Sequence, residues 1–144
     1  MWAAFQLPTE PRSPITIFRR EGTMTVQVLA ITSDLFLQSR ITELAKSLGA
    51  NAKLVTTEEE LIKEAGLRNP SLVIVDLAAS DYDPFSCTRK LKTMASPPKI
   101  LAIFPHVRTD LKLRAEEVMI DYIVPNSGFL KTLKQVIEKE VRTT

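Results

Sequence analysis

The stretch SLVIVDLAASDYDPFSCTRKLK, from Ser71 to Lys92, contains the pattern that decides the fold. It begins with apolar residues that do not alternate with polar ones, which is typical of a strand buried on both faces. The apolar run leads into Asp76. Further on, Asp83 followed by a proline predicts an N-cap and the first turn of a helix over about Pro84–Met94. The stretch therefore predicts a buried strand, a loop that starts with an acidic residue, and a helix.

Outward from this stretch, apolar segments of strand length alternate with amphipathic segments of helix length from Thr25 to Val141. Strands are expected at 25–32, 52–56, 71–77, 99–104 and 121–124, and helices at 35–49, 58–66, 84–94, 110–119 and 127–141. Five strand–helix units in strict alternation predict an α/β fold with right-handed crossovers. The expected architecture is a doubly wound (βα)5 three-layer sandwich around a five-stranded parallel sheet in the order 2-1-3-4-5.

Local signals mark where the expected helices begin and end. The first helix is capped by Ser33 or Asp34, the second opens on a capping box of Thr57 and Glu60, and the last is capped by Ser127. Within the first helix five apolar residues are predicted to share one face: Phe36, Ile41, Leu44, Ala45 and Leu48.

Length and composition fit one domain and exclude several classes of protein. The 144 residues include 19 Lys and Arg against 17 Asp and Glu, and this balance gives no electrostatic reason to expect nucleic acid or an acidic membrane as a partner. No window reaches the ~18 consecutive apolar residues of a membrane span. A single cysteine, Cys87, points to a reducing compartment, the cytoplasm. With one histidine, His106, the chain cannot assemble a zinc site of Cys/His type.

Residues 1–23 differ from the rest of the chain. Prolines stand at positions 8, 11 and 14, no period is sustained, and the order of charged and apolar residues is wrong for a signal peptide. We expect a flexible N-terminal extension over 1–23 and a folded domain over 24–144. Met24 stands directly before the first strand pattern and is a candidate for the physiological start.

The expected sheet also predicts where a site would lie. In doubly wound sheets ligands bind beyond the carboxyl ends of the strands, where the strand order reverses. For the order 2-1-3-4-5 this crevice lies between strands one and three, so Asp34 and Asp76 are expected to face each other there.

The region from about Thr25 to Val141 resembles a receiver domain of bacterial response regulators. These CheY-like modules accept a phosphoryl group on an aspartate from a histidine kinase. The run DLAASDYDPFSCTRKLK is similar to the family's Asp-Leu-x-x-Pro-x-Met-Asp-Gly run. Asp76 falls on the phospho-acceptor position, and Asp83 falls on the later Asp that caps helix three. The resemblance implies a flavodoxin-like, CheY-like fold and a role in two-component signal transduction or a phosphorelay, without enzymatic activity.

The same resemblance implies accessory groups that this sequence lacks. In the family, two acidic residues after strand one hold Mg²⁺, a Ser or Thr at the end of strand four binds the phosphoryl group, and a Lys at the end of strand five pairs with it. Here Thr32 and Ser33 fall on the acidic pair, Phe104 falls on the hydroxyl position, and Val124-Pro125-Asn126 contains no lysine.

A reduced metal site is what remains. Its candidate ligands are Asp34, Asp76 and the backbone carbonyl of Ala78. We therefore expect that the protein requires no cofactor, with Mg²⁺ binding as the alternative.

The resemblance also implies a switch and an interaction face. Tyr122 falls on the switch aromatic of the family, but the hydroxyl that would be its partner is replaced by Phe104. In receivers, partner proteins bind to the face formed by helix four, strand five and helix five. In this sequence that face carries Lys131 and Lys134. A homodimer would form through the same face. The alternative is that these charges belong to an ordinary solvated surface.

The sequence thus predicts a divergent, stand-alone regulatory module, a pseudo-receiver with an incomplete phosphorylation site. It would act by contact with a protein, a histidine kinase or a downstream effector. Two alternatives stay open. One is an active, Mg²⁺-dependent response regulator that is phosphorylated on Asp76, and the other is a small flavodoxin-like ligand-binding protein or enzyme. Against the latter, the turn TSDLF after strand one has no glycine to cradle a phosphate.

Overall fold

A computed structural model of the chain describes residues 25–143. The predictions of a flexible extension over 1–23 and of a start at Met24 lie outside the described residues. The elements follow in the order β1 (Gln27–Ile31), α2 (Leu35–Ser47), β2 (Asn51–Val55), α3 (Glu58–Arg68), β3 (Leu72–Asp76), α4 (Pro84–Lys92), β4 (Lys99–Phe104), α5 (Thr109–Glu117), β5 (Tyr122–Pro125), the 3-10 turn η1 (Asn126–Gly128) and α6 (Phe129–Thr143).

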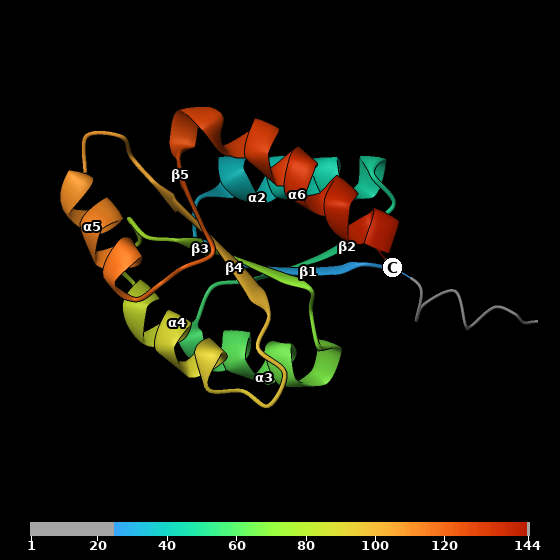
Figure 1. Cartoon of the computed structure of the whole chain (residues 1–144), viewed down its shortest axis with the longest axis horizontal. Helices are drawn as coiled ribbons and strands as arrows, with labels where there is room; N and C mark the ends of the chain where they lie inside the picture. The colour runs from blue at the N-terminus through green and yellow to red at the C-terminus, as the bar shows by residue number, and fades with distance from the viewer. Residues whose placement is uncertain (1–24, 144) are drawn as a thin grey trace, which may run out of the picture.

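The five strands form one parallel sheet in the order β2-β1-β3-β4-β5, which confirms the predicted fold class and strand order. Figure 1 shows α2 and α6 side by side on one face of the sheet and α3 and α4 on the other, with α5 beyond α4. The buried side chains divide in the same way. One apolar cluster joins the sheet to α3, α4 and α5, and a second joins it to α2 and α6.

The central strand β3 lies between β1 and β4 and is buried on both faces up to its last residue. Its four apolar side chains, Leu72 to Val75, are at most 1% exposed. Fully burying an aliphatic side chain of this size contributes about 1.5–3 kcal/mol, so the strand is firmly held. Asp76 follows these residues at the carboxyl end and is therefore presented at the middle of that edge of the sheet.

Capping residues fix where the loops leave the helices. Asp34, not Ser33, caps α2 by accepting hydrogen bonds from the backbone N–H groups of Phe36 and Leu37. Asp83 caps α4 in the same way, with Pro84 in the first turn as predicted. An N-cap of this kind is worth about 1 kcal/mol, so each carboxylate has a structural role in its loop.

The capping box of α3 is present with one difference. The backbone N–H of Glu60 donates to Thr57 Oγ1 at 3.1 Å, as predicted, but the Glu60 carboxylate accepts from the N–H of Thr56 at 3.4 Å. The helix continues to Arg68, two residues beyond the predicted end at 66, because Asn69 adopts the left-handed conformation that terminates it.

Two local predictions were wrong. Phe36 does not share the buried face of α2: it lies in the first turn and is 63% exposed, with the Arg40 guanidinium carbon 4.5 Å from its ring centroid. Ser127 does not cap the last helix, because it lies within the turn η1, so that α6 begins only at Phe129.

Between residues 25 and 143 no helix is both long enough and apolar enough to cross a membrane.

Candidate functional site

Asp76 is half-buried at the carboxyl end of β3, and both oxygens of its carboxylate accept hydrogen bonds from the chain. Thr32 Oγ1 donates to Oδ2 at 2.9 Å, and the backbone N–H of Ala78 donates to Oδ1 at 3.1 Å. Hydrogen bonds to a charged acceptor are stronger than neutral ones, so these two contacts hold the carboxylate in one orientation.

Thr32 connects Asp76 to the loop between β1 and α2. Its side chain is only 1% exposed, and besides donating to Asp76 its hydroxyl accepts from the N–H of Asp34 at 3.1 Å. Its backbone carbonyl accepts from Gln38 Nε2 at 2.7 Å, which ties the loop to α2. The sequence placed Thr32 on a position that is acidic in receivers, but it did not predict that the hydroxyl would bind Asp76.

Tyr82 is a site residue that sequence reasoning missed. Its hydroxyl lies 2.9 Å from the carbonyl oxygen of Ile31 and 2.8 Å from that of Asp76, and so it joins the ends of β1 and β3. Burial, followed by the nearby charge of Asp76, raises the pKa of the phenol far above its usual range, so Tyr82 stays a donor. The available signal was an aromatic ring with a polar tip inside an otherwise polar loop, because such a tip needs a partner when it is buried.

The surroundings of Asp76 oppose the ionisation of its carboxyl group. Burial is the largest cause and raises the pKa of the carboxyl. The hydrogen bonds from Thr32 and Ala78 act in the opposite direction, and the negative charges of Asp34 and Asp81 raise the pKa further. The net result is a pKa above the ordinary aspartate value, as is common at functional sites and at structurally buried acids alike.

The predicted metal ligands lie at the same edge of the sheet, and both carboxylates already accept hydrogen bonds from the chain. Asp34 is exposed and caps α2 through Oδ1, while Asp76 binds Thr32, and Ala78 contributes its N–H to Asp76. Among the residues that the structure describes, no group of three or more His, Cys, Asp or Glu side chains is arranged to hold a metal ion. This arrangement does not provide the donor set that the resemblance implies for Mg²⁺, and the reduced site of Asp34, Asp76 and the Ala78 carbonyl stays a prediction.

The ends of β4 and β5 are apolar. Phe104 is 4% exposed and pairs in register with Pro125, so neither a hydroxyl nor an ammonium group stands at these two positions. Phe104 packs in the cluster under α3, α4 and α5, whereas Tyr122 packs against the cluster under α2 and α6. The two residues named for the switch therefore lie on opposite faces of the sheet.

The remaining candidates are dispersed. Lys131 and Lys134 are exposed on α6, and His106 is exposed in the loop after β4. Cys87 is buried within α4, and burial raises the pKa of its thiol to about 12. A thiol with this pKa is protonated near neutrality and is a poor nucleophile.

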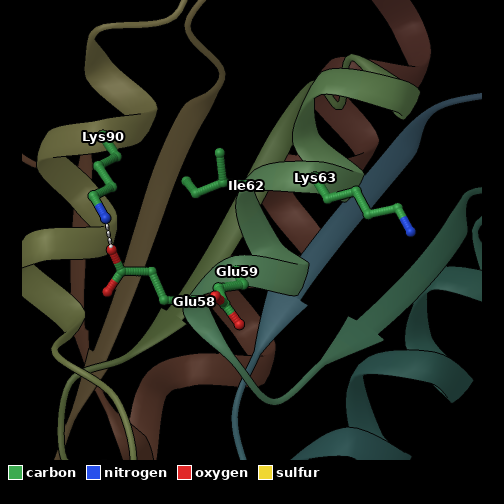
Figure 2. Close-up of a pocket in the computed structure, with 5 residues that line it drawn as sticks. All are labelled: Glu58, Glu59, Ile62, Lys63 and Lys90. Carbon is green, nitrogen blue, oxygen red and sulfur yellow. Dashed lines mark ion pairs between the residues drawn. The ribbon is translucent and has the colours of Figure 1, made fainter.

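A hollow of about 600 Å³ lies between α3 and α4 (Figure 2), away from Asp76. Its charged lining is balanced: Glu58 and Glu59 stand with Lys63 and Lys90, and Glu58 forms an ion pair with Lys90. The Ser86 hydroxyl also donates to Glu58 at 3.1 Å. Figure 2 shows Lys63 directed away from this ion pair. With its charges matched, this hollow does not select for a charged ligand.

No protein-family model matches the chain, and no curated protein matches it in sequence. Solved structures do match. A signal receiver domain from Vibrio parahaemolyticus shares 18% identity over 83% of this chain and 94% of its own, with a TM-score of 0.68. The receiver domain of a Francisella response regulator shares 14% identity over 83% of this chain and 100% of its own, with a TM-score of 0.70.

A CheY-like response regulator receiver domain protein from Methanospirillum hungatei has a TM-score of 0.71 at 11% identity, covering 83% of this chain and 95% of its own. The chain therefore has the fold of response regulator receiver domains, and it spans nearly the full length of these neighbours. At these identities the likeness concerns the fold alone. The chemistry of such a fold depends on the residues of its site.

Proposed function

We propose that this chain is a receiver-type signalling module that acts through contact with a protein partner and does not depend on phosphorylation of Asp76. It belongs in this proposal to the non-enzymatic components of two-component signalling. Its partner is a histidine kinase or a downstream effector, and its compartment is the reducing cytoplasm indicated by the single cysteine.

One observation carries the proposal: the hydrogen bond from Thr32 Oγ1 to Asp76 Oδ2 at 2.9 Å. A nucleophilic carboxylate needs an oxygen that is accessible to the phosphoryl group and a cation to neutralise the incoming charge. Here a buried hydroxyl occupies one oxygen and a backbone N–H the other. A phosphoryl group could approach only through the lone pairs that these two bonds leave on the carboxylate, and the side chain is half-buried.

The apolar ends of β4 and β5 support the same proposal. A transferred phosphoryl group develops negative charge on its oxygens, and stabilising it requires donors or cations aimed at them. Phe104 and Pro125 offer neither. A charge pair at about 4 Å and an effective dielectric of 20 is worth about 4 kcal/mol. Without a cation at these two positions, a transferred phosphoryl group would lack stabilisation of that size.

The exposed apolar side chains support action by contact. Leu35 and Phe36 at the start of α2 and Val107 after β4 are 77%, 63% and 73% exposed, and all three follow strands at the edge that carries Asp76. Leu113 on α5 is 60% exposed as well. Large exposed apolar side chains are candidates for contact with a partner protein.

Titration with beryllofluoride and Mg²⁺, followed by NMR, tests the phosphorylation-independent part. We expect no saturable shifts at Asp76 and its loop, and the same flat response from Asp76→Asn. Saturable binding to the wild type that is lost in Asp76→Asn would overturn the proposal in favour of an active phospho-acceptor.

Contact with a partner is tested separately by pull-down from the native cell. The double charge reversal Lys131→Glu, Lys134→Glu alters the α5, β5 and α6 face, and Lys46→Glu, Lys63→Glu makes the same charge change on other helices. We expect the first variant to lose a protein that the wild type and the second variant retain. Sedimentation of the same three proteins determines whether that partner is a second copy of the chain. Equal capture by all three would exclude this face.

A further inference from the structure

We draw no further inference here: the strongest candidate, the groove that Leu35, Thr42 and Leu54 line between α2 and the sheet-edge strand β2, carries none, because nothing in the described part of the chain shows what covers it.

Discussion

The carboxyl edge of the sheet has a polar half, where β1 and β3 end, and an apolar half, where β4 and β5 end. Where β1 and β3 end, Thr32, Asp76 and Tyr82 form a hydrogen-bonded network in which a buried hydroxyl, a carboxylate and a phenol find partners. Where β4 and β5 end, Phe104 belongs to the apolar core and pairs in register with Pro125, which is partly buried. The first half holds a carboxylate in a polar network, whereas the second half contributes stability and no polar chemistry.

One edge of a receiver-type fold can therefore combine a polar half with an apolar half. The strands and their register position an aspartate at the middle of the edge whether or not its neighbours are polar. The neighbours decide the chemistry, because charge that develops at the aspartate is stabilised only by groups that already point at it. The contribution of each half can therefore be tested by placing a polar side chain in the apolar half and an apolar side chain in the polar half.

The largest effect is expected from making the apolar half polar. Phe104→Thr introduces a hydroxyl at the end of β4, but it removes a side chain that is 4% exposed. Large-to-small changes at such positions cost about 3–5 kcal/mol because a cavity remains. We expect the free energy of unfolding in urea to fall by about 3 kcal/mol.

Phe36→Thr is the control, since it is the same substitution at a side chain that is 63% exposed. It should change the free energy of unfolding by less than about 1 kcal/mol. If Phe104→Thr were as stable as the control, Phe104 would not be part of the core. The ends of β4 and β5 would then not form an apolar half that stabilises the fold.

An intermediate effect is expected from removing the central donor of the polar half. Thr32→Val keeps the shape of the side chain but leaves Asp76 Oδ2 and the N–H of Asp34 without their partner. Leaving buried polar groups unpaired costs about 1–3 kcal/mol, and we expect the free energy of unfolding to fall by about 2 kcal/mol.

The same substitution at Thr42 provides the matched control. Its hydroxyl donates to the carbonyl of Gln38 on the exposed side of α2, where water can replace it. Chemical denaturation of the two variants should show a loss only for Thr32→Val. Equal losses would attribute the effect to the change from Thr to Val itself and not to the network.

The fold was accessible from the sequence because its determinants are local and repeated. Uninterrupted apolar runs such as Leu72–Val75 predict buried strands, and caps such as Asp83 with Pro84 fix the helix starts. The starts of α2 and α4 follow from their caps, but the predicted cap Ser127 of the last helix lies in η1, and the exposure of Phe36 was not predicted. Phe36 matches the helical period of α2 but lies in its first turn, where it is exposed.

The site was accessible only in part, because its contacts join residues far apart in the chain. The position of Asp76 at a strand end follows from the pattern. The bond from Thr32, which is 44 residues away, and the bridge that Tyr82 makes to Ile31, 51 residues away, depend on how two loops meet. Hydroxyl groups in loops have many available partners, and no spacing along one sequence selects among them.

The smallest predicted effect has the opposite sign and concerns the charge at the centre of the polar half. Burial raises the pKa of Asp76, so its protonated form is favoured by folding. The stability contributed by the protonated form is present below the unfolded pKa of about 3.8 and is lost as the pH rises through the folded pKa.

Asp76→Asn stays neutral throughout and can still bond to Thr32 and to the N–H of Ala78. Relative to wild type, the variant should therefore gain stability as the pH rises from 3.5 to 7, by up to about 1 kcal/mol. Urea denaturation of both proteins at a series of pH values measures this difference. A difference that is flat or that shrinks with rising pH would show that the network stabilises the carboxylate form, and that the polar half is tuned to hold a negative charge.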